Sequence, residues 1–194
     1  MQAFVDESGS HRDLDPNTYI LGAVVVDLAD LDETRSMAAD LLLPGQTKTH
    51  WRAESTKRRM VLTEALVSAP VKHLVVIHTE PDVPGERRRR TCLKRLFPAL
   101  SARGVVLATF ESRGRADDKR DMNMLGHLRA SKALDSSLRV SHRRGPDDPL
   151  LWLSDALCGV VTSARTGEPQ YRELIEHKLT IMWFMSGRAK PRAL

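Results

Sequence analysis

The sequence is poor in aromatic residues and cysteine, and it contains no long apolar run. Only 5% of its 194 residues are aromatic, and its two cysteines are Cys92 and Cys158. Two cysteines in helix-like contexts do not form the disulfide framework of a small secreted domain, so we expect reduced thiols and a cytoplasmic protein. No apolar stretch approaches the roughly 20 residues that span a bilayer. These absences argue against a membrane protein and against a disulfide-stapled scaffold.

Several common motifs are missing as well. There is no glycine-rich phosphate loop and no nucleophile elbow, which argues against a P-loop nucleotide hydrolase and an α/β-hydrolase. His73 and His78 lie in one apolar segment, without a Cys or His cluster at zinc spacing. We therefore expect structural roles for both histidines and no zinc site.

The charge balance is basic. The chain has 30 Lys and Arg residues against 25 Asp and Glu residues, which gives a net charge of +5 and a pI near 9.5. Such a balance favours polyanionic partners, of which nucleic acid is the first to consider. With 41% hydrophobic residues, the chain is long enough for one domain with a substantial core, expected to span residues 1–194.

Apolar segments of strand and helix type alternate along the chain, which predicts an α/β fold. The two N-terminal strands are expected to form a hairpin, Pro98 is expected to break or kink its helix, and the tail at 173–184 fits neither class. The expected strands are 2–6, 18–27, 71–78, 105–110 and 138–141, and the expected helices are 30–43, 54–67, 86–103, 122–134 and 149–164.

Asp155 is the most informative residue, because the helix around it is apolar on nearly every side. Between Pro149 and Val161, only Ser154 and Asp155 are strongly polar. We expect Asp155 to be at least partly buried, and a buried carboxylate needs a hydrogen bond, an ion pair or a bound cation. The alternative is a half-exposed aspartate on an ordinary amphipathic helix.

Three further carboxylates lie at predicted strand ends. Asp6 and Glu7 end the first strand before a Ser-Gly turn, and Glu111 ends the strand at 105–110. Simple turn chemistry explains the first two equally well, and Glu111 fits an ordinary solvated side chain. Three aspartates follow closely and could substitute for Glu111: Asp117, Asp118 and Asp121.

If Asp6, Glu111 and Asp155 converge at one edge of the sheet, their oxygens suit Mg²⁺ or Mn²⁺, with Glu7 as a further ligand. Two such ions can flank a phosphodiester in an in-line displacement by water, without a covalent intermediate. The sequence thus predicts a two-metal carboxylate site.

Basic residues supply candidate substrate contacts. Lys48, His50 and Arg52 surround Trp51 in a loop, where they could bind a phosphate or stack on a base. The alternative is a capping loop whose Trp51 anchors against the core. Arg88 and Arg89 belong to a basic run at 86–90, which describes either a nucleic-acid contact or a solvated helix face.

Three segments carry a family resemblance: FVDESG at 4–9, THWR at 49–52 and DPLLWLSDA at 148–156. Together they resemble an RNase H-like family catalogued as domain of unknown function 3800. The resemblance implies a mixed sheet of about five strands flanked by helices on both faces. It also implies Asp6 and Asp155 as metal ligands, with Glu111 as the acidic residue after the fourth core strand. Trp152 departs from the glutamine-like residue that related helices often carry.

Two functions follow from these patterns. The first is a divalent-metal-dependent nuclease that hydrolyses RNA or DNA. The second is a non-catalytic RNase H-like module that binds nucleic acid or a protein partner, and carboxylates that are splayed or paired with Arg would favour it. A toxin or defence effector is a third hypothesis, which rests on family analogy alone.

Overall fold

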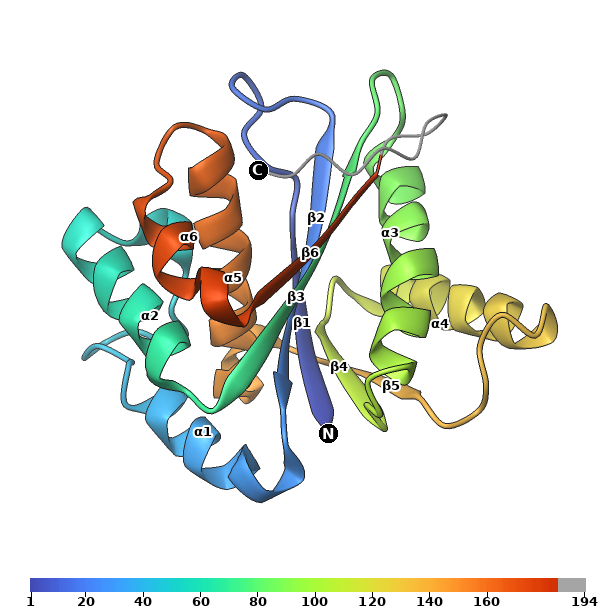
Figure 1. Ribbon diagram of the computed structural model, residues 1–194, viewed down its shortest axis with the longest axis horizontal. Helices are drawn as coiled ribbons and strands as arrows, with labels where there is room; N and C mark the ends of the chain where they lie inside the picture. Colours follow the sequence, from blue (N-terminus) through green and yellow to red (C-terminus); the bar gives the residue numbers. More distant parts are fainter. Residues whose placement is uncertain (185–194) are drawn as a thin grey trace.

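A six-stranded mixed sheet organises the chain, and the computed structural model describes residues 1–184. The strand order is β5-β4-β1-β2-β3-β6 (Figure 1). β2 runs antiparallel to both of its neighbours, and the other three strand pairs are parallel. The strands are β1 (Gln2–Ser8), β2 (Thr18–Val26), β3 (Val71–Thr79), β4 (Leu107–Glu111), β5 (Arg139–Arg143) and β6 (Leu179–Phe184).

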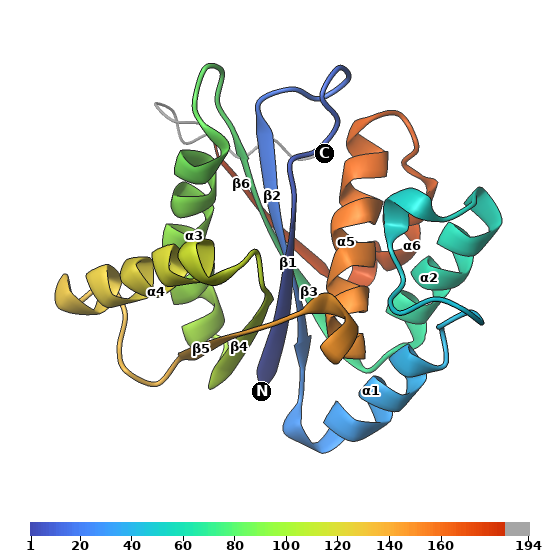
Figure 2. The same cartoon turned by 180° about the vertical axis from the view of Figure 1, so that it is seen from behind.

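Helices cover both faces of this sheet. α1, α2, α5 and α6 lie on one face, and α3 and α4 lie on the other (Figures 1 and 2). Each face has its own buried hydrophobic cluster. The α/β prediction with helices on both faces is therefore confirmed. The helices are α1 (Leu31–Ala39), α2 (Thr56–Ser68), α3 (Gly85–Ser101), α4 (Arg115–Ala130), α5 (Pro149–Arg165) and α6 (Gln170–Ile175).

The central strand β1 sends alternate side chains to the two faces. Phe4 packs in the cluster of α5, and Val5 packs in the cluster of α3. Because strand side chains alternate with a period of two, Asp6 follows Phe4 toward α5, and Glu7 follows Val5 toward α3. Neighbouring carboxylates in the sequence thus lie on opposite sides of the sheet.

The hairpin of β1 and β2 forms as predicted, with Gln2 opposite Val26 and Ser8 opposite Ile20. All residues of β2 are buried, as expected of a strand covered on both faces. Helix α5 crosses this hairpin closely, since a Cβ at Gly22 would lie 2.7 Å from Cys158 Sγ.

The predicted structural roles of the histidines and cysteines are consistent with their positions. His73 and His78 are buried in β3, and burial lowers the pKa of His73 to about 4. Cys92 and Cys158 are buried and form no disulfide. None of the described helices is long and apolar enough to cross a membrane.

Three elements differ from the sequence-based expectation. α4 begins at Arg115 rather than at residue 122, because Asp117 and Asp118 stabilise a polar first turn that lacks apolar periodicity. Pro98 does not break α3, which continues to Ser101; because it lies in the last turn, any bend that it causes affects only the few residues after it. The ambiguous tail forms α6 and then β6, which pairs with β3 as a sixth strand.

Candidate functional site

Three carboxylates from distant parts of the chain meet on the α5 face of the sheet. Asp6 comes from β1, Glu111 from the end of β4 and Asp155 from α5. Burial raises the pKa of Asp6 well above its usual range, and the charges of Asp155 and Glu111 raise it further. Within residues 1–184, the Asp6 carboxylate has no hydrogen bond and no ion pair. A half-buried carboxylate without a hydrogen-bond donor and near two other carboxylates is unfavourable without a cation.

The ammonium group of Lys48 lies within this cluster. Its Nζ donates a 2.6 Å hydrogen bond to Glu111 Oε1. Burial favours the neutral amine, but the hydrogen bond to Glu111 and the charges of Glu111, Asp155 and Asp6 outweigh it and raise the pKa of Lys48. Lys48 is therefore a fixed positive charge among the carboxylates.

Asp155 is held by the loop between α1 and α2. Its side chain is 14% exposed, so the expectation of partial burial is confirmed. Its Oδ1 lies 3.0 Å from His50 Nδ1, and its Oδ2 accepts a 2.7 Å hydrogen bond from the Trp51 backbone N–H. The hydrogen bond with Asp155 raises the pKa of His50 despite the opposing effect of burial.

Trp51 anchors this loop in the core, as the alternative interpretation of the loop predicted. The indole is buried, packs edge-on against Tyr171 at 5.2 Å between ring centroids, and donates from Nε1 to Ser163 Oγ at 3.3 Å. It lies directly over Gly159 of α5, where any Cβ would overlap the ring. A glycine at this position therefore allows the loop to reach Asp155.

A second glycine shapes the other side of the cluster. Gly145 lies just before α5, and a Cβ there would be 2.5 Å from Glu111 Oε1 and 2.9 Å from Lys48 Cδ. The Trp152 indole donates a 2.7 Å hydrogen bond to the Gly145 carbonyl and fixes the turn. The backbone at Gly145 thus packs directly on the Lys48–Glu111 ion pair, and Trp152 supports this contact.

A cavity of about 220 Å³ adjoins the cluster. Asp155, His50 and Arg52 are among its lining residues. The Arg52 guanidinium donates a 2.9 Å hydrogen bond from Nη2 to the Ser10 carbonyl, which ties the loop to the β1–β2 connection. All three basic residues predicted around Trp51 thus lie in or beside the carboxylate cluster.

Glu7 is not brought into the cluster, although it was expected to ligate metal. Its carboxylate accepts a 2.6 Å hydrogen bond from the Tyr19 hydroxyl and pairs with Arg89. The reason is the alternation of β1, which directs Glu7 toward α3. Glu7 is among the residues that line the cavity beside Asp155. Its carboxylate, however, is paired with Arg89 on the α3 face of the sheet.

Arg89 lies in the interior, so the substrate contact expected of it is corrected. It is 2% exposed and binds Asp121 through two hydrogen bonds, one of them 2.9 Å from Nε to Oδ1. Although burial opposes ionisation, hydrogen bonds from Arg89 and His142 lower the pKa of Asp121 to about 2. Asp121 therefore balances a buried arginine and does not replace Glu111 in the cluster.

The position of Arg89 could have been read from helical periodicity. It shares one stripe of α3 with the buried residues Cys92, Leu93 and Leu96. Arg88 is half-buried, and its Nη2 donates to Asn17 Oδ1 at 2.9 Å and to the Glu80 carbonyl at 2.8 Å. Arg88 thus joins two loops. The exposed basic residues of this helix are Arg87, Arg90, Lys94 and Arg95.

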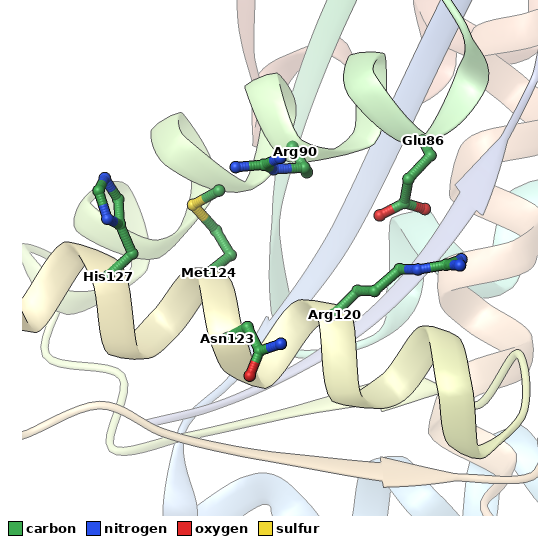
Figure 3. A pocket seen from close by; sticks show the side chains of 6 residues that line it. All are labelled: Glu86, Arg90, Arg120, Asn123, Met124 and His127. Carbon is green, nitrogen blue, oxygen red and sulfur yellow. The ribbon is translucent and has the colours of Figure 1, made fainter.

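A separate groove of about 380 Å³ runs between α3 and α4. Figure 3 shows Arg90 and Glu86 of α3 facing Arg120 and His127 of α4 across it. The groove lies on the α3 face of the sheet, opposite the face that carries Asp155. It is therefore distinct from the carboxylate cluster.

Comparison with known proteins shows what the architecture resembles. No protein-family model and no curated protein matches the sequence. The structure is similar to RNase HII in the PCNA:RNase HII complex from Archaeoglobus fulgidus, with a TM-score of 0.55 and 16% identity. It is also similar to ribonuclease H2 from Pyrococcus horikoshii OT3, with a TM-score of 0.56 and 12% identity. Each alignment covers 91% of this chain and 76% of the other.

The fold is RNase H-like. The predicted fold is thereby confirmed, whereas the finer label, domain of unknown function 3800, has no matching family model. At these identities, the likeness concerns the RNase H-like fold alone, and function has to be argued from the residues of the carboxylate cluster.

Proposed function

We propose that this chain is a divalent-metal-dependent nuclease that hydrolyses phosphodiester bonds of RNA or DNA at Asp6, Glu111 and Asp155. The observation that carries the proposal is the Asp6 carboxylate, which has no hydrogen bond or ion pair within residues 1–184 and is near enough to Asp155 and Glu111 for their charges to raise its pKa. Its position on a central strand of an RNase H-like sheet supports the same function, since the two solved structures named above are ribonucleases.

The oxygen donors present suit a hard cation by their chemistry, but not by their spacing. Within residues 1–184, no three Asp, Glu, His or Cys side chains are close enough to hold a metal ion, so the carboxylates would have to move together to bind one. Lys48 and His50 hold two of the carboxylates, while Asp6 is available. Carboxylate oxygens are the ligands that Mg²⁺ and Mn²⁺ prefer. Asp6, Glu111 and Asp155 would hold the ion, and Glu7 is not included because its charge is paired.

A bound divalent ion would activate water and stabilise negative charge on the phosphate. The chain itself supplies position and charge. Lys48, His50 and Arg52 place positive or hydrogen-bonding groups around the cluster, as phosphate recognition requires. The adjoining cavity of about 220 Å³ is smaller than the roughly 300 Å³ at which sites for drug-sized ligands begin, and suits a single phosphate group.

The rest of the nucleic acid would lie on basic surface. We propose Arg87, Arg90 and Lys94 of α3 as phosphate contacts in place of Arg88 and Arg89, because these three side chains are exposed. Since α3 and Asp155 lie on opposite faces of the sheet, only a nucleic acid that passes around its edge would reach both. Contacts of this kind bind the backbone irrespective of base sequence.

The second candidate is a non-catalytic RNase H-like module that binds nucleic acid. The observation that favours it is the pairing of Glu111 with Lys48 and of Asp155 with His50. An inert descendant of a metal site would retain such pairs, because they neutralise carboxylates that have lost their ion.

Cleavage assays separate the two candidates. Labelled single-stranded RNA, single-stranded DNA, duplexes and an RNA–DNA hybrid are incubated with wild type, D6N and D155N in Mg²⁺, Mn²⁺ or chelator. The nuclease hypothesis expects cleavage by wild type that is lost in chelator and in both variants. D13N is the matched control, since Asp13 is an exposed aspartate of the β1–β2 loop. Salt-sensitive binding without cleavage in any protein would instead support the binding module.

A further inference from the structure

Lys48 is a cation that the protein itself places in the carboxylate cluster. Its Nζ is 2.6 Å from Glu111 Oε1, and it interacts electrostatically with Asp155 and Asp6 as well. A cation in contact with one carboxylate and close to two others stands where a site built for two metal ions would place metal.

The charges of the cluster limit how many ions it can hold. As ligands of a cation, Asp6, Glu111 and Asp155 would supply three negative charges, and the ammonium group of Lys48, hydrogen-bonded to Glu111, returns one positive charge. With neutral His50, the deficit is two charges, which one divalent ion cancels. A second divalent ion would overcharge the site, and a protonated His50 would increase that excess. Excess charge of one sign at such short range is costly.

The fold holds Lys48 in this place. The Gly145 backbone packs against both Lys48 Cδ and Glu111 Oε1, in a space that a Cβ would fill. Two tryptophans fix the surroundings: Trp152 binds the Gly145 carbonyl, and buried Trp51 anchors the loop three residues after Lys48. Lys48 is thus held against rigid structure on one side, while its side chain remains 30% exposed.

We propose that Lys48 takes the place of a second metal ion, so that the site binds one divalent cation per chain. This inference rests on the proposed function and revises the two-metal arrangement that the sequence suggested. Lys48 then serves as the permanent positive charge for a phosphate oxygen, while Asp6 and Asp155 are the principal oxygen ligands.

The test is a titration of metal-free protein with Mn²⁺ in a calorimeter, without nucleic acid. Wild type should bind one ion per chain. K48M should bind two, and the first should bind about tenfold more tightly, because a repelling positive charge is gone. K57M is the matched control, since it removes the same charge from an exposed position of α2 and should bind as wild type does.

A second variant tests whether the result depends on the charge of Lys48 and not on one particular substitution. K48Q removes the charge while keeping an amide that can donate to Glu111, and it should also gain the second ion. Circular dichroism melts establish that each variant is folded before titration. Two ions in wild type, or the same stoichiometry and affinity in K48M, K48Q and wild type, would overturn the inference.

The outcome separates this inference from the proposed nuclease. Metal-dependent cleavage together with two bound ions in wild type would remove the role of Lys48 and leave the nuclease intact. A change from one ion to two without cleavage of any substrate would support Lys48 as the resident cation and reject the nuclease. No Mn²⁺ binding in wild type, K48M or K48Q would reject the metal site and the inference together.

Discussion

The backbone N–H of Trp51 donates a 2.7 Å hydrogen bond to Asp155 Oδ2. This bond joins residues that are distant in sequence and fixes the carboxylate through main chain, which is less mobile than a side chain. Bonds to a charged acceptor are among the stronger hydrogen bonds in proteins. Because Trp51 is itself buried, the orientation of Asp155 depends on how the indole packs against α5.

Replacing Gly159 should therefore disturb stability and the site together. In G159A, the new methyl group overlaps the Trp51 indole, and overpacking of this kind costs about 1–3 kcal/mol. We expect a lower midpoint in urea and weaker Mn²⁺ binding. The control is G126A in α4, where a Cβ meets nothing within 4 Å and alanine should be neutral or slightly stabilising. Equal stability of G159A and G126A would show that the Trp51 indole can move away from the new methyl group at little cost in free energy.

The raised pKa of Asp6 predicts that its charge destabilises metal-free protein. For an acid whose pKa is higher in the folded state, the favourable contribution is complete below about pH 4 and is lost as the pH rises through the raised pKa. D6N should thus melt above wild type at pH 7.5 without metal, and this advantage should shrink toward pH 4.

The same melting temperatures can be measured with Mn²⁺ present. Mn²⁺ should raise the melting temperature of wild type and leave D6N almost unchanged, because the ligand charge is missing. Identical pH profiles for the two proteins would contradict an isolated charge at Asp6.

The buried ion pair of Arg89 should be essential for stability. R89M leaves Asp121 as an uncompensated buried charge, and breaking such pairs costs about 3–5 kcal/mol. R90M changes the exposed neighbour and should stay within about 0.5 kcal/mol of wild type. Urea unfolding measures both. A small effect of R89M would mean that water or a rearranged Arg113 compensates Asp121.

Charge reversal on the exposed face of α3 should weaken nucleic-acid binding. R87E and R90E each remove one phosphate contact under the proposed function, so the slope of log K against log salt should flatten by about 0.9 per contact on duplex DNA. The control is K72E, which alters an exposed lysine near the start of β3. It should leave the slope unchanged. If R87E and R90E bind with the wild-type slope, α3 lies outside the footprint.

Much of the fold follows from hydrophobic patterning. The buried runs of β2 and β3 and the apolar helix α5 were predicted close to their observed bounds, because their periodicity is strong. α4 was predicted too short, since its polar first turn contains no apolar signal. β6 was left unassigned, because a half-buried edge strand depends on tertiary pairing with β3.

The site was only partly predictable. Asp155 stands out by its apolar surroundings and Asp6 by its place at a strand end, both of which are local features. The pairing of Lys48 with Glu111 has no local signal, because the two residues are 63 positions apart. The burial of Arg89 did have a local signal, because Arg89 lies on the same side of its helix as Leu93 and Leu96.

The alternation of Asp6 and Glu7 along β1 links the candidate site to the integrity of the core. A slip of this strand by one residue would exchange the faces of the two carboxylates. The same slip would take Glu7 away from Arg89 and remove Asp6 from Asp155 and Glu111. A chain that has paired β1 incorrectly therefore leaves the buried Arg89 with Asp121 alone, so the strand that presents Asp6 also destabilises misaligned molecules during folding.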